Sequence, residues 1–323
     1  MQAAPVFFGD PVQVSLCSVV RKTVFSRAAA AGAEQQGCLV LLIVGYVIIL
    51  AASIGTYAVH GSLMALWVPL EYLAIFGLMI GGFVASNTGR SMKATLKAIP
   101  SALKGSPYNK AMYMDLLAMM YEILAKVRKE GLMSIENDVD NPESSPIFSK
   151  YPSVMADHHA IEFLTDYLRM MVGGNLNAFE IENLMDMEIE THHTEAHGPA
   201  HNVAKVGDAL PAFGIVVAVM GVVNVMGSVG EPPAVLGKMI GGALVGTFLG
   251  ILLSYGFVQP IAGQLEQKVE EGGKIYQCMK VVLLASMNGY APQVAVEFGR
   301  KVLFSTDRPT FSELEEDIKA RKG

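Results

Sequence analysis

Four long runs without charged residues constrain the fold of this chain more than any other feature of its sequence. Asp, Glu, Lys and Arg are absent from 35–70, 72–89, 209–230 and 239–265. A helix that crosses the hydrocarbon core of a membrane needs about 20 predominantly apolar residues. We therefore predict transmembrane helices at Leu39–Ala58, Leu66–Ser86, Leu210–Val229 and Met239–Gly263. The alternative, buried helices of a large soluble protein, fits poorly with 17% charged residues, because soluble domains average about 25%.

The positions of the Lys and Arg residues orient these spans. Of 24 such residues, 11 lie in 87–207, 9 lie after position 263 and 3 lie before the first run. The two short loops between paired spans hold only Lys238. Cytoplasmic flanks of membrane proteins carry the positive excess. Both chain ends and the long segment 87–207 are therefore expected on the cytoplasmic side, with the spans surrounded by membrane lipid.

The remaining sequence predicts an all-α protein, a polytopic membrane protein with four transmembrane helices and a helical cytoplasmic domain. Apolar residues recur every three or four positions in Lys110–Gly131, which is typical of an amphipathic helix. The expected parts are a leader (1–38), spans one and two (39–86), a cytoplasmic helical domain (87–207), spans three and four (208–263) and a cytoplasmic tail (264–323). The leader lacks the basic start of a signal peptide and is either a flexible extension or a start-site artefact.

Few polar residues lie within the predicted spans. No acid or histidine lies in the middle of span three or span four, although ionisable residues inside a membrane are usually functional. A chain of this kind is not expected to relay protons alone, so a second polypeptide should supply the titrating carboxylate. Thr247 then either lines the ion path or bonds to its own backbone. Glu71, in span two, either reaches to the outer interface or pairs with a neighbouring chain.

Prolines and glycines distinguish spans three and four from simple membrane anchors. Proline inside a helix frees a backbone carbonyl, so Pro211 and Pro260 each predict a bend or a hydrated spot near the cytoplasmic side. Small residues four positions apart either let two helix backbones approach closely or reflect ordinary helix packing. Span four carries such a ladder at Gly242, Gly246 and Gly250.

Histidine and cysteine give no firm metal or disulfide pattern. His193, His197 and His201 follow one another at four-residue spacing, which would place them on one helix face. Gly198 and Pro199 are expected to end the helix before His201, so we interpret these histidines as surface residues and predict no metal site and no cofactor. The three cysteines are irregularly spaced, and the net charge of −6 gives no indication of nucleic-acid binding.

Long blocks of the chain, from about Val40 to Lys322, resemble the MotA family within the MotA/TolQ/ExbB ion-channel superfamily. The blocks include KAMYMDLLAMMYEILAKVRKEG, DALPAFGIVVAVMGVV and LVGTFLGILLSYGFVQPIA. The resemblance implies a non-enzymatic stator subunit of the flagellar motor in the bacterial inner membrane. It further implies that five chains surround a dimer of a single-span MotB-type subunit, whose aspartate binds the ion.

The resemblance also implies roles for particular residues. Arg128 and Glu136, in a mixed-charge cluster with Lys126, match the torque residues that face the rotor protein FliG. Pro211 and Pro260 match prolines that couple ion passage to cytoplasmic movement, and Thr247 matches the hydroxyl residue beside the ion path. Ala218 stands where sodium-driven relatives carry a second threonine, which favours protons. Two alternatives remain: a TolQ/ExbB-like energiser of an envelope machine, and a membrane metalloenzyme built on the histidines.

Overall fold

The computed structural model describes residues 39–59, 61–174 and 177–321, so the leader 1–38 lies outside the described part. Within these ranges all regular structure is helical, as predicted. Four of the described helices are long and apolar enough to cross a membrane: Leu39–Val59, Leu63–Ser86, Ala178–Met226 and Pro233–Met287. Each contains or overlaps one predicted span. The all-α membrane fold with four spans is therefore confirmed.

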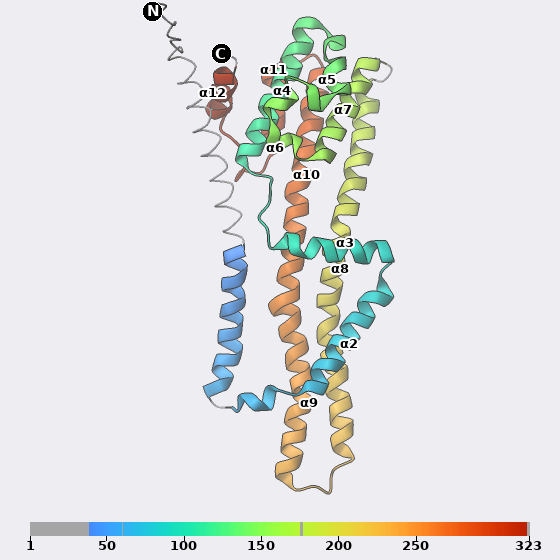
Figure 1. Cartoon of the computed structure of the whole chain (residues 1–323), viewed down its shortest axis with the longest axis vertical. Helices are drawn as coiled ribbons and strands as arrows, with labels where there is room; N and C mark the ends of the chain where they lie inside the picture. The colour runs from blue at the N-terminus through green and yellow to red at the C-terminus, as the bar shows by residue number, and fades with distance from the viewer. Residues whose placement is uncertain (1–38, 60, 175–176, 322–323) are drawn as a thin grey trace, which may run out of the picture.

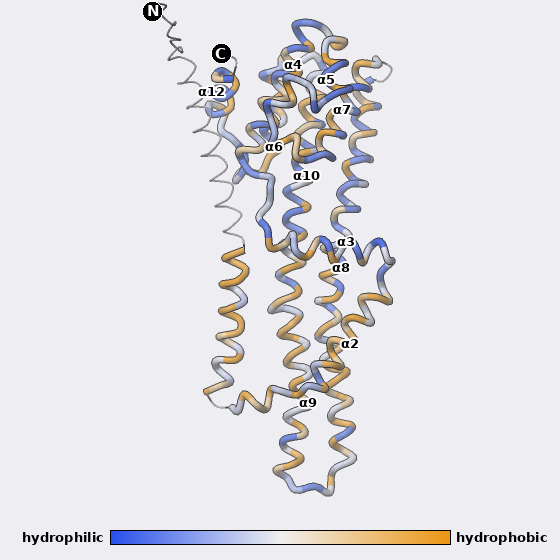
Figure 2. The backbone as a smooth tube through the Cα atoms, viewed as in Figure 1, coloured by the Kyte–Doolittle hydropathy of each residue, from blue (hydrophilic) through white to orange (hydrophobic). Residues whose placement is uncertain are grey.

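Two long antiparallel columns form the axis of the molecule (Figure 1). One column is the single helix α8 (Ala178–Met226). The other consists of α9 (Pro233–Leu253), a π-helical turn η5 (Ser254–Val258) and α10 (Gln259–Met287). Both columns continue from the apolar half of the molecule into its polar half (Figure 2). They therefore connect the membrane spans to the polar half without an intervening loop. We call this half the cytoplasmic part, after the side of the membrane that the sequence predicts for it.

Glycines bring α8 and α9 into close contact inside the apolar half. A methyl group added at Gly250 would meet the carbonyl oxygen of Leu210 at 2.7 Å and the Cα of Gly214 at 2.9 Å. One added at Gly214 would meet the carbonyl oxygen of Gly246 at 2.7 Å. Only glycine permits backbones to approach this closely. The ladder on span four thus packs against α8, although its first member, Gly242, lies outside the contact.

The remaining membrane helices surround these columns. Helix α2 (Pro69–Ser86) follows the short η1 (Leu63–Leu66) and crosses α8 obliquely, whereas Leu39–Val59 stands further away (Figure 1). The latter is joined to the second column by Tyr46, whose hydroxyl donates to the carbonyl of Phe257 at 3.0 Å.

Helix α3 (Gly89–Ala102) lies across both columns where the apolar half ends. Asn202 of α8 holds it by donating to Ser91 and Thr95.

The cytoplasmic part has one hydrophobic core, built around α4 (Lys110–Glu130). The side chain of Asn109 caps the start of α4, and Gly131, at φ 88°, ends it where the sequence predicted. Against α4 pack α10, α11 (Pro292–Val302) and α12 (Phe311–Arg321), and α7 (His158–Gly173) joins the same core against α10. Short helices between α4 and α7 complete it: η2 (Leu132–Ile135), α5 (Glu136–Asp140), η3 (Pro142–Ser144), η4 (Phe148–Lys150) and α6 (Pro152–Met155). The segment after the last span therefore shares this core.

The expected helix end at Gly198 and Pro199 is wrong, because α8 continues through both residues and through Pro211. Proline in a helix interior costs about 3 kcal/mol through the lost hydrogen bond and a steric clash. Just beyond Pro199, however, Ala200 and Val203 are buried in a cluster with residues of α3 and α10. This packing offsets the local cost, which a rule based on neighbouring residues alone does not include.

Candidate functional site

One hydrogen bond connects the two prolines that the sequence singled out. Pro211 has no N–H for the carbonyl of Gly207, four residues earlier. The hydroxyl of Ser254, which is fully buried, donates to that carbonyl at 2.6 Å. Ser254 begins the π-helical turn that directly precedes Gln259 and Pro260. The carbonyl that Pro211 leaves without its helical donor therefore meets the π-helical turn of the α9–α10 column. We call Gly207, Pro211, Ser254 and Pro260 the proline node.

A second polar contact lies beside the proline node. The side-chain amide of Gln259 donates to a carboxylate oxygen of Asp208 at 2.6 Å and lies 3.5 Å from the carbonyl of Ala204. A methyl group added at Gly207 would meet the Gln259 amide nitrogen at 2.9 Å. The two columns are thus held together at the cytoplasmic end of the spans by side chains, where close backbone contact has ended.

Thr247 and Ala218 lie on the glycine-rich contact between α8 and α9. Thr247 is half-buried, and its Cα lies 3.3 Å from where a methyl group at Gly214 would stand. Its hydroxyl makes no hydrogen bond to any residue that the structure describes, so the self-bonded alternative is not observed. Ala218 is buried on α8, one turn beyond Gly214. Both residues are therefore close to the α8–α9 contact, and the Thr247 hydroxyl keeps its capacity to bind.

Glu71 points inward rather than to the outer interface. A methyl group added at Gly246 would meet Glu71 Oε2 at 3.2 Å, and one added at Gly221 would meet Oε1 at 3.5 Å. Oε2 is buried and has no hydrogen-bond partner among the described residues. The carboxylate lines an open cleft of about 1230 Å³ together with Asn224 and Lys238. Spans three and four lack an acid of their own, but α2 brings one to their glycine face.

Arg128 and Glu136 lie at the far end of the cytoplasmic part, on either side of a tight turn. Arg128 occupies the last turn of α4 and Glu136 begins α5. Both are exposed, and neither forms an ion pair with another described residue. Between them Leu132 and Met133 are exposed to 39% and 64%. The sequence predictions did not include these apolar neighbours, although two apolar residues directly after a helix-ending glycine can be recognised in a sequence.

Lys126, a third member of the predicted charge cluster, has a different environment. Its ammonium group pairs with Asp138 at 2.6 Å, and Asp138 also accepts a hydrogen bond from Ser145 at 2.6 Å. Asp138 is only 4% exposed. Leaving a buried carboxylate without its partners costs several kcal/mol, so Lys126 and Ser145 hold the turn in place. The cluster therefore divides into a structural part and the exposed pair Arg128 and Glu136.

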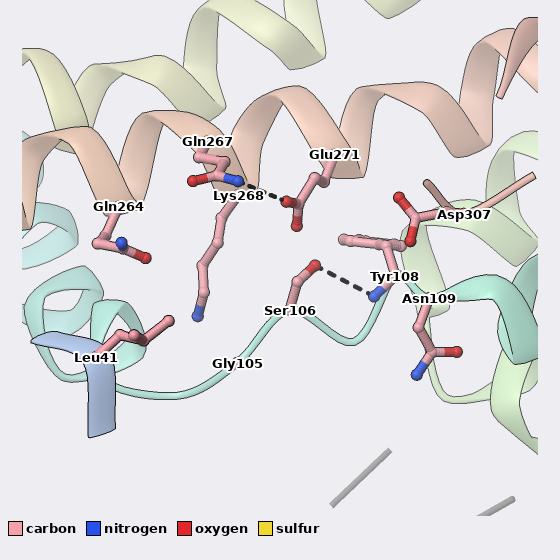
Figure 3. Close-up of a pocket in the computed structure, with 10 residues that line it drawn as sticks. All are labelled: Leu41, Gly105, Ser106, Tyr108, Asn109, Gln264, Gln267, Lys268, Glu271 and Asp307. Carbon is pink, nitrogen blue, oxygen red and sulfur yellow. Dashed lines mark hydrogen bonds between the residues drawn. The ribbon is translucent and has the colours of Figure 1, made fainter. Parts of the chain in front are cut away.

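A separate hollow of about 450 Å³ lies where the α3–α4 connection passes α10 (Figure 3). Lys268 extends from α10 toward this connection and donates to the carbonyl of Ser101. Gln267 donates to Glu271 at 3.3 Å, and the backbone N–H of Tyr108 donates to Ser106. The predicted site residues do not line this hollow. Of these three bonds, the one from Lys268 joins α10 to the last turn of α3, close to the end of the membrane spans.

Two of the three evenly spaced histidines meet an acid from another helix. His193 and His197 of α8 lie within 3.4 Å of Glu270 of α10. His201 is exposed on the same helix and does not join them. The sequence does not predict this group, because Glu270 lies more than 70 positions from the histidines and its face on α10 depends on the packing of the two columns.

Comparison with known proteins decides the family. Residues 43–131 match the family model described as Motility protein A N-terminal, and residues 156–277 match the MotA/TolQ/ExbB proton channel family. Motility protein A of Escherichia coli K12 is 53% identical over 283 residues, which are 87% of this chain and 96% of that protein. The chain belongs to the MotA family.

Other MotA relatives support the same assignment. Motility protein A of Salmonella typhimurium LT2 is 52% identical over 87% of this chain and 95% of that protein. Chemotaxis protein LafT of Vibrio parahaemolyticus is 32% identical over 86% and 98%. Two solved structures share the fold. C. jejuni MotAB gives a TM-score of 0.67 at 20% identity, covering 83% of this chain and 98% of that chain. The MotAB stator complex of Bacillus subtilis gives 0.61 at 24%, covering 85% and 98%.

Proposed function

We propose that this chain is an ion-conducting stator subunit of a bacterial flagellar motor. With a single-span MotB-type partner it converts an ion gradient, here of protons, into torque on the rotor protein FliG. The observation that carries the proposal is the 53% identity to a motility protein A over 96% of that protein's length. The proposal gives the chain no catalytic residue and places it in the inner membrane as a pentamer, with both termini in the cytoplasm.

The proposed mechanism begins at the membrane spans. An ion moving down its gradient releases about 2.3 kcal/mol per charge per 100 mV. The ion binds an aspartate of the partner against α8 and α9, beside Thr247 and Ala218. The side chain of Ala218 has no oxygen that could bind sodium, which favours protons. Glu71 is a second carboxylate near this path, and its unpaired oxygen supports a role there.

Movement is then transmitted along the two columns. Protonation of the partner's aspartate changes how the ring of these subunits contacts the partner. The proline node lets α8 and the α9–α10 column bend at the same level. Because both columns continue into the cytoplasmic core, the bend moves α4 and its end. Arg128 and Glu136, which are exposed and form no ion pair with another described residue, then act on charged residues of the rotor. Leu132 and Met133 supply apolar contact beside them.

Charge reversal at the rotor-facing turn tests this assignment. Arg128→Glu combined with Glu136→Lys should abolish swimming, because the steering charges are inverted, while the amount of protein in the membrane stays unchanged. Lys301→Glu, which reverses another exposed cytoplasmic charge, serves as the matched control and should swim normally. Normal swimming of the double variant would remove Arg128 and Glu136 from the rotor contact.

Gene deletion separates the stator proposal from the TolQ/ExbB-like alternative. Deletion should leave filaments assembled but cells unable to swim, and the wild-type gene should restore swimming. An energiser of an envelope machine would instead leave swimming unchanged and impair the envelope. Repeating the restoration in sodium-free medium tests the ion: undiminished swimming is expected for a proton-driven motor, and its loss would assign sodium.

A further inference from the structure

Three potential metal ligands converge on one point between α8 and α10. The Nε2 atoms of His193 and His197 lie 3.1 Å apart. The carboxylate oxygen Oε1 of Glu270 lies 3.3 Å from the first and 3.4 Å from the second. All three distances are therefore nearly equal, and one corner of the triangle comes from a different helix. The side chains are 43%, 24% and 52% exposed, so an ion can reach them from the cytoplasm.

The dimensions of this triangle match those of a bound transition metal. Metal–ligand bonds of about 2.0–2.1 Å in tetrahedral geometry place neighbouring ligand atoms about 3.3–3.4 Å apart. Two imidazoles and one carboxylate, with a fourth position open to water, form a common zinc-binding set. Imidazole nitrogen also selects zinc, cobalt, nickel or copper over magnesium and calcium, which prefer oxygen. We propose that His193, His197 and Glu270 bind one divalent transition-metal ion, zinc or a chemical equivalent.

The three ligand atoms are also held in place without a bound cation. His193 and His197 are one helical turn apart within α8, which fixes their spacing. Glu270 of α10 brings one carboxylate oxygen to both imidazoles. The two facing Nε2 atoms cannot both keep a proton directed at each other, and a metal ion would satisfy all three ligand atoms at once.

Occupancy would fasten the two columns together between the membrane and the rotor-facing end. Other polar contacts already join them on either side of the triangle. Lys280 pairs with Asp186 at 2.7 Å toward the cytoplasmic end, and Gln259 donates to Asp208 at the end of the spans. The metal would join the two columns between these contacts and would restrict the movement of α8 relative to α10. This site does not depend on the proposed motor function, because its ligands and geometry belong to this chain alone.

Cobalt titration of the intact protein tests the site. The full-length chain, purified with its MotB-type partner and without a polyhistidine tag, is stripped with a chelator and titrated with Co²⁺ by calorimetry and visible absorption. One ion per chain is expected, with the intense visible bands of tetrahedral cobalt. His193→Gln, His197→Gln and Glu270→Gln should each weaken binding at least tenfold. His201→Gln, in the neighbouring exposed histidine of the same helix, should bind like the wild type.

Absence of binding at 100-fold molar excess of Co²⁺ would overturn the site. Unchanged affinity in Glu270→Gln would also overturn it, because the ion would then be held by the histidines alone and would not join the columns. Thermal unfolding gives a second readout: Co²⁺ should raise the melting temperature of the wild type and of His201→Gln by several degrees, but not that of Glu270→Gln. Motility is not needed for either measurement, so the failure of the motor proposal would leave this test intact.

Discussion

Ser254 joins the two columns through a single hydrogen bond from its side chain. Its hydroxyl supplies the hydrogen bond that Pro211 removes from the carbonyl of Gly207, and it does so from the irregular turn before Pro260. An unsatisfied buried carbonyl costs about 1–3 kcal/mol. One serine therefore offsets the local cost of a proline on another helix, and it joins the two columns beside both prolines.

Replacing Ser254 by Ala should destabilise the protein by about 1–3 kcal/mol, because the buried Gly207 carbonyl then loses its donor. We expect a melting temperature several degrees below that of the wild type in thermal unfolding of the purified complex. Ser53→Ala is the matched control, since the Ser53 hydroxyl donates to carbonyls of its own helix, those of Ile49 at 2.7 Å and Leu50 at 3.5 Å. Equal stability of the two variants would contradict a special role for Ser254.

Cys278 is predicted to be unreactive in the folded protein. It is completely buried, and burial raises the pKa of its thiol to about 12. Only about one thiol in ten thousand is ionised at pH 8, and the thiolate is the reactive form. Maleimide at pH 8 should therefore leave Cys278 unmodified in the native protein and modify it fully in SDS, as read by peptide mass spectrometry. Modification of the native protein at the rate of a free thiol would show that the α10–α11 core opens readily.

At the scale of elements, the contact between α8 and α9 depends on glycine at particular positions rather than on small residues in general. Gly214 and Gly250 place backbone against backbone, whereas Gly241 has no neighbouring atom within 4 Å of an added methyl group. Membrane helices gain their association from such packing, because lipid provides no hydrophobic drive between helices. The contact is thus a property of facing positions on two helices.

Gly250→Ala should separate α8 from α9, because the added methyl group would stand 2.7 Å from a backbone oxygen that cannot move aside. We expect reduced amounts of assembled complex in the membrane and lost or strongly reduced swimming. Gly241→Ala adds the same methyl group to the same helix in open space and should behave like the wild type. Blue-native electrophoresis of membrane extracts and swim-plate diameters measure both effects, and equal behaviour of the two variants would refute the packing argument.

Elements were predictable where a local pattern determines them. Hydrophobic runs located the four spans, and the three- and four-residue periodicity of α4 together with Gly131 located its end. The continuous α8 was not predictable, because the stabilising packing at Ala200 and Val203 comes from α3 and α10. For the same reason the inward turn of Glu71 and the meeting of Glu270 with the histidines required the structure. The hydrogen bond from Ser254 to Gly207 likewise joins positions 47 apart.

For the whole molecule, continuity between membrane and cytoplasm is the main feature. The two columns run from the outer end of the spans into the core around α4 without a flexible connection (Figure 1). In the proposed mechanism, a movement at the ion path reaches Arg128 and Glu136 through these packed helices. The same architecture carries no acid of its own in spans three and four, and Glu71 is the only carboxylate of the described residues that turns toward their glycine face.

The central claim is that this chain conducts ions only together with a second polypeptide that supplies the ion-binding acid. Proton flux into liposomes tests it most directly, with a pH-sensitive dye inside and an imposed membrane potential. Liposomes holding this chain alone should be as tight as empty ones, and those holding it with the MotB-type partner should take up protons. Flux through this chain alone, at the rate of the complex and lost in Glu71→Gln, would contradict the claim and make Glu71 the ion-binding acid.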